Sequence, residues 1–295
     1  MILNVSGRTD IVAFYTNWFM KRYEDGYVDV RNPFNTSLVS RIYFEDVNGI
    51  IFCTKNPKPI LNYINKIDKP VMFQITLTSY KNDIEPNVPN KTEIIECIKE
   101  ISKMIGKDNV IIRYDPIFLS DKYTINYHIK AFDKMCLLLN GYVSKIIISF
   151  IDIYKNVMYN YKELNIKEFT DEDYMMIGIR FSEIARKNNM TVQTCCEDRN
   201  LVEYGFTKGD CFTIDDAYKL TGKKYGKWKA RKNPNCNCAE MVDIGYYNSC
   251  KHFCKYCYAN YDERRVNENF SLHDPNSSLL IGKLLDTDII KVRKK

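Results

Sequence analysis

The sequence predicts an α/β fold built on a parallel sheet of the (β/α) barrel type. Short, nearly continuous apolar segments rich in β-branched residues recur along the chain, and amphipathic helical patterns separate many of them. About eight such segments suit a barrel, either complete or partial. The 295 residues, 45% hydrophobic and 27% charged, are enough for one barrel or for two medium domains.

Each expected strand is a short apolar run bounded by turn residues. The runs are residues 3–6, 49–53, 71–76, 110–113, 145–150, 191–194, 212–214 and 241–244. Apolar residues at helical spacing predict helices over residues 91–105 and 125–139, each followed closely by a glycine. Thr170 and Asp173 match a capping box, which predicts a further helix that runs to about residue 187.

A change in composition divides the chain near residue 220. Residues 1–220 hold most of the strand–helix pattern and are expected to form the barrel body. Residues 221–295 begin with a polar, basic linker and continue into a cysteine-rich segment that supplies the expected strand 241–244 and the loop after it. Because that strand is expected to join the same sheet, the two parts should form one integrated domain.

The net charge of +6 is mildly basic, which allows an anionic ligand but does not establish nucleic-acid binding. No apolar run is long enough to span a membrane, and the first residues lack the pattern of a secretory signal, so we expect a cytoplasmic protein. Structural disulfides are rare in that compartment. The 11 cysteines therefore indicate metal binding or buried thiols.

The most informative motif is the triplet Cys250, Cys254 and Cys257, which has the spacing C-x3-C-x2-C. Three thiolates on one tight loop can bind three irons of a 4Fe–4S cube. The fourth iron then lacks a protein ligand and is open to a substrate or cofactor. This spacing predicts a catalytic iron–sulfur site.

A structural zinc site is the alternative for this region, because soft ligands are abundant there. Its candidate ligands are Cys236, Cys238, Cys250, His252, Cys254 and Cys257. Zinc knuckles usually show two C-x2-C-like pairs with a spacer, so the triplet favours the cube.

The triplet, with Tyr256 directly before its third cysteine, resembles the motif of the radical S-adenosylmethionine superfamily. The resemblance implies a 4Fe–4S cluster that binds S-adenosylmethionine, reductive cleavage to a 5′-deoxyadenosyl radical, and a reductant such as flavodoxin or ferredoxin. It also implies a TIM or partial-TIM barrel. The superfamily motif lies near the N-terminus, whereas here it begins at residue 250. We therefore expect a permuted order in which strand 241–244 closes against strand 3–6.

A second group of cysteines lies outside the triplet and is expected to gather at one rim of the barrel. Its members are Cys195, Cys196, Cys211, Cys236 and Cys238. Auxiliary clusters are common among the enzymes that the triplet resembles, which implies a second 4Fe–4S cluster here. A zinc site and metal-free buried thiols are the alternatives.

Nearly the whole chain also resembles a bacterial family called domain of unknown function 1848. The segments that carry the resemblance are residues 6–10 (SGRTD), 30–34 (VRNPF), 54–57 (TKNP), 113–117 (RYDPI), 243–245 (DIG) and 256–260 (YCYAN). That family is itself likened to radical enzymes through the same C-terminal cysteine cluster. The resemblance therefore implies the same chemistry.

Polar residues follow several expected strands, at the edge where α/β proteins bind ligands. Thr54, Lys55 and Asn56 sit where radical enzymes bind the amino group of the cofactor, and with Tyr256 they are the expected cofactor-binding residues. A turn fixed by Asn56 and Pro57 is the alternative. The expected catalytic residues, which could instead form ion pairs with one another, are Arg8, Asp10, Arg113 and Asp115.

The sequence thus predicts a radical S-adenosylmethionine enzyme. The competing interpretations are a zinc-stabilised nucleic-acid-binding protein and an iron–sulfur electron-transfer protein. The chain has no G-x-G-x-x-G fingerprint and no G-x4-G-K-[ST] loop, so nicotinamide chemistry and nucleotide hydrolysis lack support.

Overall fold

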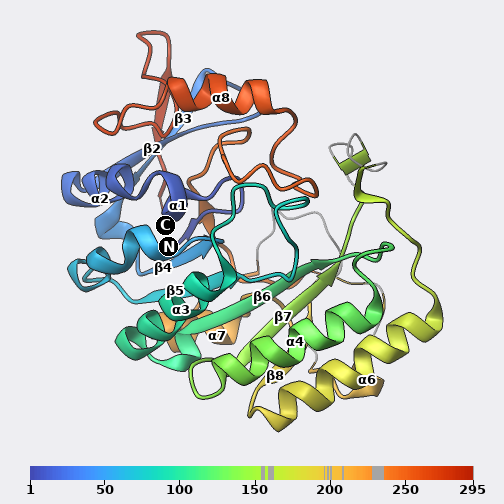
Figure 1. The fold of residues 1–295 in the computed structure, drawn as a ribbon. Coiled ribbons are helices and arrows are strands. Elements are labelled where there is room, and N and C mark those ends of the chain that lie inside the picture. The colour runs from blue at the N-terminus through green and yellow to red at the C-terminus, as the bar shows by residue number, and fades with distance from the viewer. Residues whose placement is uncertain are drawn as a thin grey trace.

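The computed structural model describes residues 1–153, 157–158, 163–195, 197, 199, 201–207, 209–227 and 236–294. Its main feature is a seven-stranded parallel sheet in the order β8-β7-β6-β5-β4-β1-β9 (Figure 1). The strands are β1 (Ile2–Val5), β4 (Gly49–Thr54), β5 (Val71–Thr76), β6 (Val110–Ile117), β7 (Lys145–Phe150), β8 (Thr191–Thr194) and β9 (Val242–Asp243).

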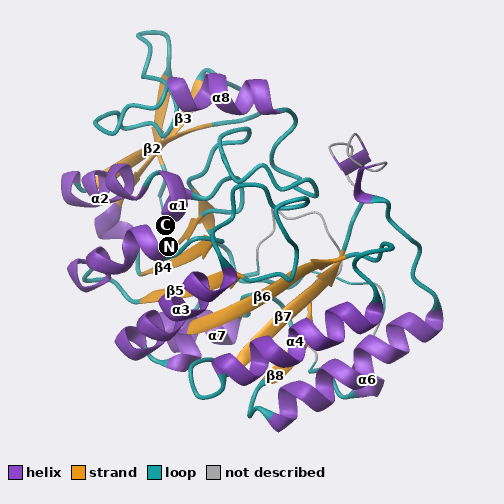
Figure 2. Cartoon of the chain, viewed as in Figure 1, coloured by secondary structure: helices purple, strands orange, loops and turns teal. Residues whose placement is uncertain are grey.

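Helices cover both faces of this sheet, and Figure 2 shows them around the strands. The α-helices are α1 (Ile11–Phe14), α2 (Thr16–Asp25), α3 (Lys91–Ile105), α4 (Ile125–Leu139), α6 (Asp171–Lys187), α7 (Ile214–Thr221) and α8 (Glu263–Ser271). Short 3-10 helices are η1 (Phe44–Asp46), η2 (Lys58–Lys66), η3 (Lys107–Asn109) and η4 (Val202–Tyr204). A smaller sheet, in the order β10-β3-β2, joins β2 (Tyr27–Arg31), β3 (Leu38–Tyr43) and β10 (Ile289–Val292).

The two faces of the large sheet are buried in different clusters, because successive side chains of a strand point to opposite faces. Val5 and Phe52 belong to the larger core, which also includes residues of α1, α2, α3, α4 and α6. Ile51 and Met72 point the other way, into a smaller cluster that contains Ala217 of α7. Burial on both sides explains why the strands are almost continuously apolar.

The strand predictions are confirmed at seven of the eight segments, with small shifts at the ends. The predicted pairing of the last strand with the first is also confirmed, since Leu3 pairs with Val242 and Asn4 with Asp243. The helices over 91–105 and 125–139 have the predicted bounds, and Thr170 forms the predicted capping box at the start of α6.

The predicted strand at 212–214 is wrong. Ile214 begins α7 instead, because Thr213 and Asp216 form a capping box that starts a helix at that point. The prediction rested on the apolar residues and missed this local signal. Apolar residues alone do not separate a short strand from the first turn of a helix.

The sheet places β8 and β9 at its two edges, and within the described ranges no pairing joins them. The α/β class and the parallel sheet are therefore observed, whereas closure into a full barrel is not. Separately, none of the helices in the described part of the chain has the length and apolar character needed to cross a bilayer.

His128 of α4 is fully buried and links the helix to the loop after β5 and to the end of β6. Its Nδ1 lies 2.9 Å from the Tyr114 hydroxyl, and its Nε2 lies 3.0 Å from the carbonyl oxygen of Phe118. With hydrogen on Nε2 the ring donates to the Phe118 carbonyl, and Nδ1 is left as an acceptor facing the Tyr114 hydroxyl. Burial lowers the pKa of this imidazole from 6.5 to about 4, although the Phe118 carbonyl opposes the shift.

A histidine whose folded pKa is lowered destabilises the fold as the pH falls below its unfolded pKa. We expect His128→Gln, whose amide can make the same two hydrogen bonds, to remove about 2 kcal/mol of the stability loss between pH 7.5 and pH 5. Urea unfolding at the two pH values measures this difference. Lys130→Gln, an exposed change on the same helix, should keep the wild-type pH dependence. Equal pH slopes for wild type and His128→Gln would contradict the assignment.

Candidate functional site

The cysteine triplet lies on the loop after β9, at the carboxyl edge of the sheet beside the loop after β1. The Asp243 carboxylate holds these two loops together. Its Oδ1 accepts hydrogen bonds from the Ser6 hydroxyl at 2.9 Å and from the Gly245 N–H at 2.8 Å, and its Oδ2 accepts from the Gly7 N–H at 2.6 Å. A Cβ at residue 245 would lie 1.9 Å from the Ser6 hydroxyl oxygen, so this close approach requires glycine.

The three thiols of the triplet share a poorly solvated loop and interact electrostatically. Cys250 and Cys254 are buried and Cys257 is half-buried. Burial raises the pKa of all three thiols, and Asp10 and the other two thiols raise that of Cys250 further. The Ala259 N–H donates to the Cys257 sulfur at 3.4 Å. Thiolates in such a setting need a nearby cation, which a bound metal supplies.

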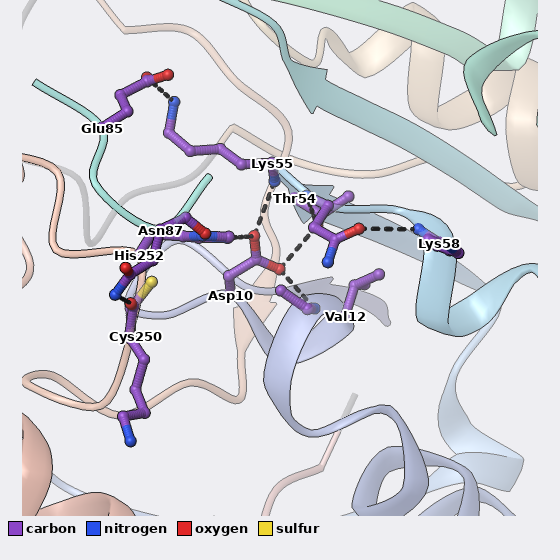
Figure 3. A network of polar contacts seen from close by, with 12 residues as sticks. Asp10, Val12, Thr54, Lys55, Lys58, Glu85, Asn87, Cys250 and His252 are labelled. Atoms are coloured by element: carbon purple, nitrogen blue, oxygen red, sulfur yellow. Dashed lines mark hydrogen bonds and ion pairs between the residues drawn. The ribbon is translucent and has the colours of Figure 1, made fainter. Parts of the chain in front are cut away.

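Asp10 connects the triplet loop to two other elements (Figure 3). Its carboxylate caps α1 through the Ala13 N–H at 2.9 Å, and accepts from the Thr54 hydroxyl at 2.7 Å and the Lys55 N–H at 2.8 Å. His252, inside the triplet loop, places Nε2 at 2.9 Å from Asp10 Oδ2. The carboxylate is therefore fully engaged by protein donors. This geometry favours a positioning role over direct contact with a substrate.

The Nδ1 of His252 faces the backbone carbonyl of Asn87 at 3.2 Å. The side chain of Asn87 in turn donates to the carbonyl of Lys251 at 2.8 Å. The segment between β5 and α3 thus contacts the first half of the triplet loop, in addition to the contact that Asp10 makes. Asp10 and Asn87 therefore hold residues 251 and 252, which directly follow Cys250.

Lys55 lies in a buried charged network on the other side of the triplet. Its Nζ is 2.9 Å from Glu85 Oε1 and 2.7 Å from the Tyr256 hydroxyl. Glu85 also accepts from Lys91, Tyr256 and the Thr78 hydroxyl, and only 1% of its side chain is exposed. Burial raises the pKa of Glu85, but Lys55 and Lys91 more than offset this and lower it to about 2.

This network brings positive charge to the triplet. Lys55 and Lys91 both lower the pKa of the Cys254 thiol, against the larger opposite effect of burial. Glu85 neutralises only one of the two ammonium groups. The remaining positive charge favours an anionic group near the triplet.

Arg113 and Asp115 form an ion pair at the end of β6. Arg113 also donates to Gln74 at 3.2 Å, and Asp115 accepts from Ser149. Burial by itself would lower the pKa of Arg113. Asp115 and the thiols Cys195 and Cys211 have the opposite effect, and together they hold this pKa above the usual range. Asp115 also interacts electrostatically with Lys55, so the pair faces the same region as the triplet.

Arg8 lies at the rim of this region. Its guanidinium is 3.8 Å from Asp243 and stacks over the ring of Tyr247, with 26% of its side chain exposed. Asn56 follows Thr54 in a turn in which the Asn56 N–H donates to the Thr54 hydroxyl at 2.9 Å. The turn at Asn56 and Pro57, which was the alternative to a cofactor-binding role, is thus present. The same turn also positions Lys55.

Several residues that hold this site are not predicted by the sequence patterns. Glu85 and Asn87 lie in the long connection from β5 to α3, where no periodic pattern marks them. Asp243 belongs to a motif of the family resemblance, but the motif by itself assigns it no role. The signal that could have found it is the isolated acidic residue within an apolar strand, because a buried carboxylate needs several donors.

The second cysteine group is partly brought together. Cys195, Cys211, Cys236 and Cys238 are buried near one another on the sheet face that contacts α7. Cys196 lies outside the described residues. The described members of the group are therefore Cys195, Cys211, Cys236 and Cys238.

Glu85 should contribute strongly to stability, because its removal leaves two partly buried ammonium groups without their carboxylate partner. We expect Glu85→Gln to lower the free energy of unfolding by about 3 kcal/mol. Glu93→Gln is the matched control, because Glu93 pairs with Lys58 at the surface, where their side chains are 42% and 64% exposed. That control should leave stability at the wild-type value. Equal effects of the two changes, measured by urea unfolding, would show that the buried network is not required.

The family model described as domain of unknown function (DUF1848) matches residues 2–259. The match includes every strand of the large sheet and all three cysteines of the triplet. A search of curated proteins finds no match for the chain.

Proposed function

The chain belongs to the DUF1848 family, and on that premise we propose that it is a radical S-adenosylmethionine enzyme. Its 4Fe–4S cluster would be held by Cys250, Cys254 and Cys257. The observation that carries the proposal is the parallel pairing of β9 with β1, which brings the triplet loop to the carboxyl edge of the sheet.

The strand order supports a permuted relationship to the radical enzymes. Starting from β9, the sheet continues through β1, β4, β5, β6, β7 and β8 in chain order. The strand that carries the triplet is thus first in space although it comes last of these in sequence. We propose that the sheet is a partial barrel in which this permutation leaves every spatial neighbour unchanged.

The residues around the triplet fit a cluster with one open iron. The loop supplies three buried or half-buried thiols, and a backbone N–H already points at the sulfur of Cys257. The hydroxyl of Thr9, next to Asp10, is buried and has no hydrogen-bond partner within the described ranges. A buried polar atom of this kind favours a ligand in the same region.

When bound, the cluster supplies the electron that cleaves S-adenosylmethionine to a 5′-deoxyadenosyl radical. The protein's own residues bind and orient. Thr54, Lys55, Asn56 and Tyr256 are proposed to line the cofactor site, with Lys55 offering charge to a carboxylate. Asp10 and His252 fix the loop, and burial of the thiols excludes water.

Arg8, Arg113 and Asp115 are proposed to face the substrate. Arg8 and Arg113 lie at the ends of β1 and β6, so they flank the carboxyl edge of β4 and β5 from two sides. Each guanidinium already has a carboxylate partner. A polar substrate group could accept a hydrogen bond from either guanidinium while its carboxylate partner stays in place, so that no buried charge is left uncompensated.

We expect Cys250→Ala to abolish formation of 5′-deoxyadenosine. The assay uses anaerobically reconstituted protein, dithionite and S-adenosylmethionine, with the product measured by chromatography. Cys97→Ala is the matched control, because Cys97 is a buried thiol of α3 away from the triplet. Production of 5′-deoxyadenosine by the Cys250→Ala protein at the wild-type rate would defeat the assignment. A brown wild-type protein that makes no 5′-deoxyadenosine would instead support electron transfer.

A further inference from the structure

A carboxylate and two cysteine thiols meet where the segment before α7 lies beside the segment before β9. Ligand atoms of Asp210, Cys236 and Cys238 all lie within 4.8 Å of one another. Both cysteines are buried in the smaller hydrophobic cluster, whereas Asp210 is half-buried. Among the residues that the structure describes, no other three side chains of the metal-binding types lie this close together.

Backbone contacts hold the carboxylate in place. The Asp210 carbonyl accepts a hydrogen bond at 2.8 Å from the side chain of Gln193, which is itself buried. A Cβ at residue 209 would lie 2.8 Å from the side-chain oxygen of Gln193, so glycine allows this close approach. Asp210 Oδ1 accepts from the Asn237 N–H at 2.6 Å. Because Asn237 lies between the two cysteines in the chain, this bond keeps the carboxylate beside both thiols.

The segment that carries the two cysteines is also held by its backbone. The Ala239 N–H donates to the Phe212 carbonyl, and the Glu240 N–H donates to the Gly226 carbonyl, both at 2.9 Å. These bonds join the segment to the residues on either side of α7. The three ligand atoms are therefore brought together by contacts that do not involve them.

The group combines negative charge with soft ligands. Within the described ranges, no lysine or arginine forms an ion pair with Asp210. Thiols bind metals as thiolates, and two buried thiolates beside a carboxylate would repel one another strongly. A divalent cation bound between the three groups removes this repulsion.

We propose that Asp210, Cys236 and Cys238 form a metal site that holds one zinc ion. Zinc binds thiolate sulfur at about 2.3 Å and carboxylate oxygen at about 2.1 Å, so tetrahedral ligands stand roughly 3.5 to 3.8 Å apart. Separations of up to 4.8 Å exceed these values by about 1 Å, which side-chain rotation can supply. Thiolate ligands favour zinc over magnesium or calcium. Water on the half-buried side of Asp210 would be the fourth ligand.

The neighbouring thiols of Cys195 and Cys211 are not ligands in this proposal. In the described part of the chain, no compact group of three includes either of them. The Cys211 sulfur nevertheless lies 3.1 Å from the Cys238 sulfur. When Cys238 is bound to the ion as a thiolate, the Cys211 thiol can donate a hydrogen bond to it. Outer groups commonly orient metal ligands in this way.

The zinc site would have a structural role. It would join the segment before α7 to the segment that leads into β9. Since β9 pairs with β1 through only two residue pairs, an anchor just before β9 would help to hold the strand in the sheet. The site does not depend on the radical chemistry proposed for the triplet.

The sharpest variant is Asp210→Asn, because asparagine can still accept from the Asn237 N–H but lacks the charge of the ligand. Zinc and iron are measured per chain in full-length protein purified anaerobically, and zinc affinity is measured by competition with a chelator. Asp210→Asn, Cys236→Ser and Cys238→Ser should each weaken zinc binding. The loss should exceed the roughly 10- to 100-fold that changes in outer groups cause.

Two variants serve as controls. Asp215→Asn changes a carboxylate of α7 that is 68% exposed, and Cys195→Ser changes a thiol outside the proposed ligands. Both should keep one zinc per chain. Because serine variants could misfold, zinc-edge X-ray absorption of the unchanged protein is the second measurement. It should show two sulfur neighbours at about 2.3 Å, with the remaining neighbours oxygen at about 2.1 Å.

Four sulfur neighbours, or loss of zinc from Cys195→Ser, would overturn the proposal in favour of a four-thiolate site. Iron retained by the triple variant Cys250→Ala/Cys254→Ala/Cys257→Ala would overturn it in favour of the second 4Fe–4S cluster predicted from the sequence. Absence of both metals from that variant would overturn it in favour of buried thiols. Failure of 5′-deoxyadenosine formation with zinc still present would count against the radical chemistry alone, so the two proposals can fail separately.

Discussion

The pairing of β9 with β1 is the constraint on which the rest of the site depends. It involves only two residue pairs, so backbone hydrogen bonds alone hold it weakly. The Asp243 carboxylate compensates by accepting hydrogen bonds from the loop after β1 and from the loop after β9. Gly245 lets these two loops approach closely. A charged group buried with this many donors is costly to separate from them. The carboxylate therefore adds to the few backbone hydrogen bonds that hold this short strand.

Charge is distributed around the triplet in a consistent way. On one side Asp10 and His252 fasten the loop, and on the other Lys55 and Lys91 surround Glu85. The protein thus places carboxylates where they hold its own backbone and leaves a surplus of ammonium groups near the thiols. These ammonium groups lower the pKa of the Cys254 thiol, although burial has the larger and opposite effect.

The two cysteine groups show why cysteine content alone is a poor guide to metal chemistry. Both groups are buried, and both lie near basic side chains. They differ in how the chain brings them together. The triplet sits on one continuous loop, whereas the second group is gathered from three parts of the chain.

The sequence by itself determined the α/β class, most strands of the sheet and the triplet. These features depend on local patterns: apolar runs at 71–76 and 145–150, helical spacing at 91–105 and the capping box at Thr170. Only the tertiary structure decided that Glu85 and Asn87 reach the triplet loop, and that Cys211 meets Cys238. These contacts join residues far apart in the chain. Their energies come from burial and charge pairing, which no local pattern encodes.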